Sequence, residues 1–175
     1  NIDTDSIKDG LLNFKVRGRM ERVDVSVRYS VFIDYAHNGV SMESILSTVK
    51  EYNPKRIVSL FGCGGNRSRD RRFDMGEVSG KYADLSVITS DNSRYESFDD
   101  IAKDILVGMK KTNGKYIIIP DRREAIKYCI ENAQDGDVIL ILGKGHEDYQ
   151  EINGERHPFD ERAVINDIMK ELGMK

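Results

Sequence analysis

The chain has 175 residues, of which 39% are hydrophobic and 33% charged, and this composition is typical of one soluble globular domain with a sizeable core. The formal net charge of −3 argues against a nucleic-acid-binding protein that relies on a general positive field. Two cysteines far apart in sequence indicate a reducing compartment, and no apolar run is long enough to span a bilayer, so we expect a cytoplasmic protein with no membrane partner.

Apolar runs and periodic apolar positions alternate along the chain in lengths that suit strands and helices. In chain order we expect a helix over 6–14, strands over 23–27 and 30–35, a helix over 41–52, a strand over 56–61, a helix over 71–82, a strand over 84–89, a helix over 98–111, a strand over 115–119, a helix over 123–133, a strand over 137–142, a hairpin over 150–157 and a last helix over 161–172. Asn153-Gly154 is a favoured hairpin turn, and Asp160 is a suitable N-cap for the last helix.

This alternation, with its short connections, predicts an α/β fold. We expect a doubly wound, Rossmann-like, mainly parallel sheet of about six strands with helices on both faces. The carboxyl ends of parallel strands share one edge, where such folds bind ligands. Polar and charged residues gather in the loops that leave this edge, at 34–39, 62–72, 90–95, 120–123 and 143–148. The sequence therefore predicts a binding site there.

Two glycine-containing loops resemble nucleotide-binding motifs only in part. Gly62-x-Gly64 is followed by Arg67 where a dinucleotide-binding fingerprint has its third glycine, which disfavours a nicotinamide-dependent oxidoreductase. Gly143-Lys144-Gly145-His146 lacks both the earlier glycine and the Ser/Thr of a P-loop. The glycines after residue 61 can equally serve only a tight turn from strand to helix.

Residues 67–72 contain four arginines in six positions, at the expected start of a helix. A solvated helix start is one interpretation. Against it, positive charge opposes the helix dipole, so these arginines would need an anion or carboxylate nearby.

Residues 91–94 combine a carboxylate, an amide and a guanidinium. Such a set suits a zwitterionic ligand, with Arg94 facing its carboxylate and Asp91 or Glu147 facing its ammonium. Asp91 can alternatively cap the helix that follows. The spacing of His37 and His146 matches no standard zinc motif, so we expect no metal site within this chain.

Taken together, the loop motifs occur in the order and at the intervals of a known family. They are Gly18-Arg19-Met20-Glu21, Asp34-Tyr35-Ala36-His37, Gly62-x-Gly64-Gly65-x-Arg67, Asp91-Asn92-x-Arg94 and Gly143-Lys144-Gly145-His146-Glu147-Asp148-Tyr149-Gln150. The chain resembles the C-terminal domain of the Mur ligases, most closely the UDP-N-acetylmuramoyl-tripeptide synthetases (MurE type). The resemblance implies that residues 1–15 are a linker or helix from a preceding domain and that residues 16–175 are the domain that closes over ATP and brings the amino acid.

The resemblance also implies a reaction. ATP and Mg²⁺ activate a UDP-muramoyl-dipeptide carboxylate as an acyl phosphate, which the amine of a diamino acid attacks to form a peptidoglycan precursor. By motif, the nucleotide-facing residues are Arg19, Asp34 and His37. The amino-acid pocket is implied to consist of Arg67, Asp91, Asn92, Arg94, Gly143 and Glu147. Because the family's meso-diaminopimelate-adding members hold the distal carboxylate with the arginine that corresponds to Arg94, we expect meso-diaminopimelate rather than L-lysine.

Several positions depart from the family pattern. Ser93 replaces a proline, Asn66 replaces an aspartate, and Asn38 replaces the threonine after the histidine motif. Losing a proline is expected to loosen the loop. A divergent paralogue with another acceptor, or a non-catalytic module that binds an amino acid or nucleotide, therefore stays open. The chain also contains no P-loop sequence, so we expect the phosphate site and the Mg²⁺ on upstream domains, and no ligation by the isolated chain.

Overall fold

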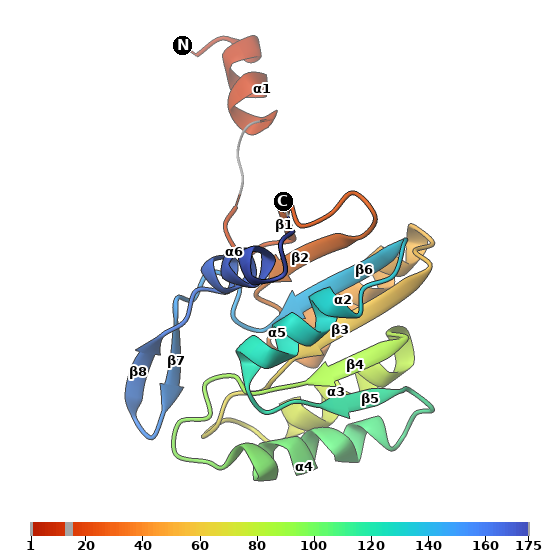
Figure 1. Ribbon diagram of the computed structural model, residues 1–175, viewed down its shortest axis with the longest axis vertical. Coiled ribbons are helices and arrows are strands. Elements are labelled where there is room, and N and C mark those ends of the chain that lie inside the picture. The colour runs from red at the N-terminus through yellow and green to blue at the C-terminus, as the bar shows by residue number, and fades with distance from the viewer. Residues whose placement is uncertain (1, 13–15, 175) are drawn as a thin grey trace.

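A computed structural model of the chain describes residues 2–12 and 16–174 (Figure 1). The strands are β1 (Glu21–Val23), β2 (Ser30–Asp34), β3 (Arg56–Phe61), β4 (Leu85–Ile88), β5 (Tyr116–Ile118), β6 (Asp137–Leu142), β7 (Tyr149–Ile152) and β8 (Glu155–Pro158). The helices are α1 (Thr4–Leu12), α2 (Gly39–Glu51), α3 (Asp70–Tyr82), α4 (Phe98–Met109), α5 (Arg122–Glu131) and α6 (Glu161–Glu171).

Six strands form one sheet in the order β1-β2-β6-β3-β4-β5. Only β1 runs antiparallel to its neighbour; the remaining pairs are parallel. β7 and β8 form a separate hairpin beyond the end of β6 (Figure 1). The expected doubly wound, mainly parallel sheet is therefore confirmed.

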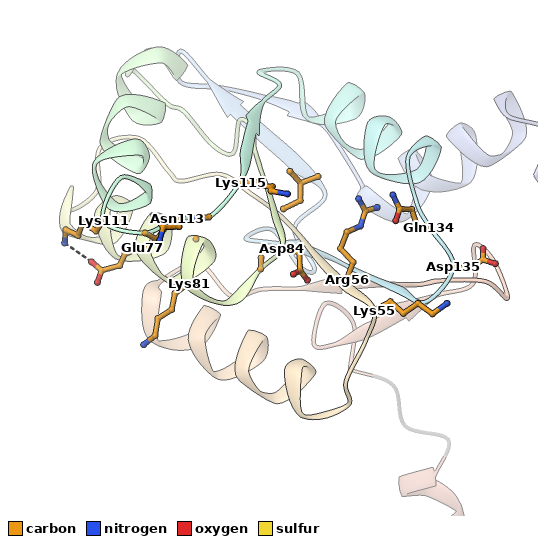
Figure 2. Close-up of a pocket in the computed structure, with 15 residues that line it drawn as sticks. Lys55, Arg56, Glu77, Lys81, Asp84, Lys111, Asn113, Lys115, Gln134 and Asp135 are labelled. Atoms are coloured by element: carbon orange, nitrogen blue, oxygen red, sulfur yellow. Dashed lines mark hydrogen bonds and ion pairs between the residues drawn. The ribbon is translucent and has the colours of Figure 1, made fainter.

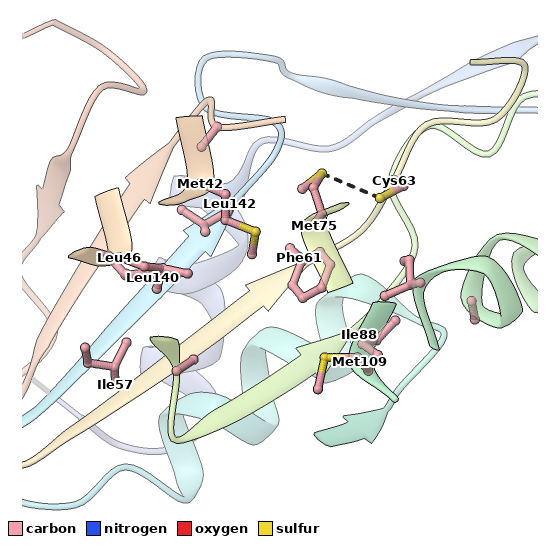
Figure 3. Packing of buried hydrophobic residues seen from close by; sticks show 14 of the residues in the cluster. Met42, Leu46, Ile57, Phe61, Cys63, Met75, Ile88, Met109, Leu140 and Leu142 are labelled. Atoms are coloured by element: carbon pink, nitrogen blue, oxygen red, sulfur yellow. Dashed lines mark hydrogen bonds between the residues drawn. The ribbon is translucent and has the colours of Figure 1, made fainter. Parts of the chain in front are cut away.

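Alternate residues of each central strand enter two different cores, because side chains on a strand point to opposite faces. On β6, Leu140 and Leu142 belong to a core cluster that also contains residues of α2, α3 and α4, part of which Figure 3 shows. Ile139 and Ile141 pack on the other face, against α5 and α6. Burial on both faces explains why β6 reads as an uninterrupted apolar run. It also confirms helices on both faces of the sheet.

Most element boundaries lie within two residues of those expected, but one strand was placed wrongly. The alternation of Val23, Val25 and Val27 predicted a strand over 23–27, whereas β1 ends at Val23. Val25 enters the core from an irregular segment, and Val27 is fully exposed. The last residues of the helix expected over 6–14 lie outside the described residues, and α1 stands apart from the sheet (Figure 1).

The neighbouring strands β3 and β6 lead to opposite faces of the sheet. β3 is followed by α3, on the face of the first core, and β6 leads through the hairpin to α6 on the other. Diverging connections of this kind open a crevice at the carboxyl ends of the strands. No helix in the described part of the chain is long and apolar enough to cross a membrane.

Candidate functional site

Four loops at the carboxyl edge of the sheet enclose a cavity of about 400 Å³. All six residues predicted for amino-acid binding line it, and so does His37. Arg19 and Asp34 lie outside the lining. The other lining residues are Tyr35, Cys63, Gly64, Ser68, Arg71, Arg72 and Tyr149. Residues from distant parts of the sequence thus meet where the fold was expected to place a site.

The glycines after β3 let two loops approach closely. A Cβ atom on Gly62 would lie 2.4 Å from the carbonyl oxygen of Thr89, and one on Gly65 only 1.9 Å from that of Ser93. The backbone N–H of Gly65 donates to the Asn92 carbonyl at 2.8 Å. These glycines therefore serve the contact between the β3–α3 and β4–α4 loops, for which only glycine leaves room.

A buried lysine joins two of the residues that line the cavity. Lys144 is completely buried, and its Nζ donates to Asn92 Oδ1 and to Glu147 Oε2, each at 3.1 Å. The amide of Asn92 donates to the same Glu147 oxygen at 2.9 Å. Because Oε2 accepts both bonds, Glu147 Oε1 is the oxygen left to meet a ligand. The sequence pattern around Lys144 indicates only an incomplete P-loop and gives no sign of this role.

The carboxylate of Asp91 faces the cavity because Gly143, beside it, has no side chain to cover it. Asp91 Oδ1 accepts the backbone N–H of Asn92 at 2.6 Å. Asp91 Oδ2 would lie 2.8 Å from a Cβ on Gly143, whose φ of +113° also favours glycine. Any larger residue at position 143 would cover this carboxylate.

The four arginines of residues 67–72 divide into two pairs. Arg69 and the buried Arg72 both bind the carboxylate of Asp104, and Arg72 also binds both oxygens of Glu96 at 2.9 Å. Hydrogen bonding from Arg69 lowers the pKa of Asp104, and hydrogen bonding from Arg72 lowers that of Glu96. Asp104 and Glu96 are therefore the carboxylates expected beside arginines at the start of a helix.

Arg67 and Arg71 form the second pair. Both are exposed and line the cavity, and neither has an ion-pair partner among the described residues. They are the cations that remain available to an anionic ligand. The cavity thus presents Arg67, Arg71 and Arg94 together with the carboxylates of Asp91 and Glu147, which is the charge pattern a zwitterion needs.

Tyr35 connects the residues implied to face a nucleotide. The Arg19 guanidinium lies 4.8 Å from the centre of its ring, and the rings of His37 and His146 lie at 4.7 and 4.9 Å. Burial raises the pKa of Tyr35. Exposed Arg19 and His37 are able to meet a phosphate.

Asp34 is placed differently from Arg19 and His37. It is buried, and its carboxylate accepts the backbone N–H groups of Met20 at 2.7 Å and Ala36 at 2.8 Å. In this conformation both oxygens are engaged by the backbone. Asp34 therefore fixes the turn that carries Arg19.

A fully buried ion pair lies beneath the loops. Arg122 Nε and Nη2 bind Glu161 Oε1 at 2.9 and 2.7 Å, and the same guanidinium donates to the carbonyls of Ser90 and Leu142. Burial raises the pKa of Glu161, and the Arg122 charge opposes that rise. The pair joins the ends of β4 and β6 to α6, so the 120–123 loop supports the site without lining it.

A larger hollow of about 980 Å³ lies at the opposite edge of the sheet (Figure 2). It contains none of the predicted site residues, and its labelled side chains, such as Lys55 and Lys115, are exposed or half-buried. Within residues 2–12 and 16–174, no group of three or more His, Cys, Asp or Glu side chains is arranged to hold a metal ion. The cavity at the carboxyl edge is the better candidate.

Comparison with known proteins gives consistent matches. A family model described as "Mur ligase, glutamate ligase domain" matches residues 18–145. The UDP-N-acetylmuramoyl-L-alanyl-D-glutamate–2,6-diaminopimelate ligase of Caldanaerobacter subterraneus subsp. tengcongensis is 46% identical over 166 residues, which are 95% of this chain and 34% of that relative. The ligase of the same name from Aquifex aeolicus is 45% identical over 168 residues, which are 96% and 34% of the two chains.

A solved structure of a UDP-N-acetylmuramoyl-L-alanyl-D-glutamate–2,6-diaminopimelate ligase has the same fold. It aligns with a TM-score of 0.84 at 34% identity and covers 99% of this chain but 36% of that one. The chain therefore spans about a third of the length of the relatives it matches.

Proposed function

The chain belongs to the Mur ligase family, and from that premise we propose that it is the amino-acid-binding domain of an ATP-dependent amide ligase. Its substrates would be 2,6-diaminopimelate and UDP-N-acetylmuramoyl-L-alanyl-D-glutamate, as the names of its relatives state for those proteins, and the meso form is the one that the motif around Arg94 implies. Residues 1–15 would connect residues 16–175 to upstream ligase domains. The reaction belongs to peptidoglycan precursor synthesis in the cytoplasm.

One observation supports this proposal above the others: carboxylates and guanidinium groups face the same cavity. Asp91 and Glu147 offer oxygens for an ammonium, and Arg67 and Arg94 offer guanidinium groups for carboxylates. A diamino dicarboxylic acid carries both kinds of charge at each end. A cavity of about 400 Å³ is large enough for a molecule of this size.

In the reaction, ATP supplies the phosphate that activates the acceptor carboxylate. This chain would then hold the attacking amine in place, so that its contribution is proximity and charge stabilisation rather than covalent catalysis. Arg19 and His37 fit the phosphate side of ATP because both are exposed beside Tyr35. We expect the upstream domains to hold Mg²⁺, and we expect the isolated chain to form no amide bond.

The test is a comparison of ligation rates for meso-diaminopimelate and L-lysine by the ligase that carries this chain as its C-terminal domain. L-Lysine lacks the distal carboxylate and should be the poorer substrate. A preference for L-lysine would overturn the choice of amino acid. Binding of the amino acid without ATP hydrolysis would instead indicate a non-catalytic binding module.

A further inference from the structure

The β7–β8 hairpin lies against the loop that carries Arg94, and its contacts converge on this residue. The backbone N–H of Arg94 donates to the Glu151 carbonyl at 2.9 Å, and that of Asn153 donates to the Arg94 carbonyl at 2.6 Å. Arg94 and Ile152 also form an isolated bridge between the two segments. The hairpin is thus attached to the loop through both the N–H and the carbonyl of one residue, Arg94.

These contacts hold Arg94 in an unusual backbone conformation. Its φ is +51°, in the left-handed region that residues with a side chain rarely adopt. The hairpin turn that supplies the Asn153 N–H is itself built from positive φ angles, +52° at Asn153 and +81° at Gly154. Although Ser93 was expected to loosen this loop, the backbone beside it is held by the hairpin.

The Arg94 side chain is held as well. Its Nη1 donates to the carbonyl of Gly65 at 2.9 Å, and its Nε lies 3.4 Å from Glu151 Oε2. The two side chains are 20% and 21% exposed, so water only partly competes with this pair. A guanidinium has five N–H donors in a fixed plane. Contacts on two sides therefore fix the direction in which the remaining donors point.

Glu151 also contacts a second residue of the same loop. Its backbone N–H donates to Asn92 Oδ1 at 2.9 Å, the same oxygen that accepts Lys144 Nζ. Asn92 in turn donates to Glu147. Glu151 thus contacts Arg94 directly and is linked to Glu147 through Asn92.

We propose that Glu151 is a positioning residue that directs the Arg94 guanidinium toward the distal carboxylate of the incoming amino acid and so contributes to selectivity for a diamino dicarboxylic acid. The inference rests on the proposed function. The negative charge of Glu151 also offsets part of the attraction of Arg94 for a carboxylate. Because the pair is partly solvated, this loss of attraction is small, and the fixed orientation of the Arg94 guanidinium outweighs it.

The kinetic test uses the ligase that carries this chain, with Glu151→Ala and Glu151→Gln. Glu151→Ala should raise the KM for meso-diaminopimelate about fivefold while kcat and the KM for L-lysine stay within about twofold. The glutamine of Glu151→Gln can still accept a hydrogen bond from Arg94. The KM of this variant for meso-diaminopimelate should therefore lie between those of wild type and Glu151→Ala. Glu155→Ala is the matched control, because Glu155 is an exposed glutamate of the same hairpin.

An unchanged or lower KM for meso-diaminopimelate in Glu151→Ala would overturn the proposal, and a lower value would mean that Glu151 competes with the ligand for Arg94. An equal rise in the KM for meso-diaminopimelate and for L-lysine would overturn it too, since a general disturbance of the loop would raise both values.

A second measurement does not depend on activity. Side-chain ¹⁵N NMR of this chain reports how fast the Arg94 guanidinium rotates, and Glu151→Ala should speed that rotation whereas Glu155→Ala should not. Equal rotation in all three proteins would contradict positioning. If wild-type ligase does not use meso-diaminopimelate, the proposed function fails, and the NMR result still decides whether Glu151 positions Arg94.

Discussion

The ammonium of Lys144 lies 3.1 Å from Glu147 Oε2 and is completely buried. Through Asn92, the same ammonium also contacts the loop after β4. Two loops from different strands therefore share one buried positive charge directly beneath the cavity. This charge compensates Glu147 and fixes the direction of its carboxylate.

Lys144→Met should destabilise the protein because it leaves Glu147 without its partner. We expect a loss of about 3 kcal/mol, at the lower end of the cost of breaking a buried pair, since the Glu147 side chain is 18% exposed. Urea unfolding measures this loss. Lys170→Met is the control, because Lys170 pairs with Asp167 at the surface. Its substitution should cost less than about 1 kcal/mol of stability. Equal losses in the two variants would refute a structural role for the buried ammonium.

Gly65→Ala should separate the β3–α3 and β4–α4 loops, which carry Arg67 and Arg94. The added Cβ would lie 1.9 Å from the Ser93 carbonyl oxygen, so the backbone must move, at a cost of about 1–3 kcal/mol. Gly10→Ala is the control, because nothing lies within 4 Å of a Cβ there and alanine favours the helix. Thermal unfolding of both variants compares them. A Gly65→Ala protein as stable as wild type would show that the contact is not needed.

Much of this fold was predictable because β6 and β3 are buried on both faces and therefore appear as apolar runs of strand length. The misplaced strand at Val23–Val27 shows the limit of periodicity. Alternation indicates which side chains can share a face, but a strand also needs a hydrogen-bonded partner, and β1 has one only as far as Val23.

The site was predictable as a set of loops but not as a network. Lys144 and Asn92 are 52 residues apart, and no local pattern indicates that one contacts the other. Asp34 illustrates the same difficulty: the motif implies a ligand contact, whereas the structure places its carboxylate on two backbone N–H groups. Which arginines of residues 67–72 stay unpaired likewise depends on Asp104, which lies on α4.

The stability of the α3–α4 contact should depend on acid pH through Asp104. Hydrogen bonding from Arg69, and then from Arg72, lowers the pKa of this carboxyl in the folded protein. A lowered pKa gives stability that is present above the unfolded pKa of about 4 and is lost as the pH falls through the folded value. Asp104→Asn should therefore lower the midpoint of urea unfolding at pH 7. Below about pH 4, the midpoint of the variant should decrease less steeply with falling pH than that of wild type. A variant curve parallel to that of wild type would contradict this assignment.

The buried pair of Arg122 and Glu161 should behave as one unit. Arg122→Met leaves Glu161 buried without a counter-charge and should cost about 3–5 kcal/mol. Adding Glu161→Gln removes that charge, so the double variant should be less destabilised than the sum of the two single variants. A double-mutant cycle by urea unfolding measures the coupling. Additive losses would mean that the two side chains stabilise the protein independently.

We propose that this cavity receives the incoming diamino acid with Arg94 on its carboxylate. The most direct test is the kinetics of Arg94→Ala with meso-diaminopimelate in the ligase that carries this chain, beside Arg22→Ala, which removes an exposed arginine on β1. We predict that Arg94→Ala abolishes the use of meso-diaminopimelate while Arg22→Ala does not. Unchanged kinetics with Arg94→Ala would mean that Arg94 does not bind the amino acid.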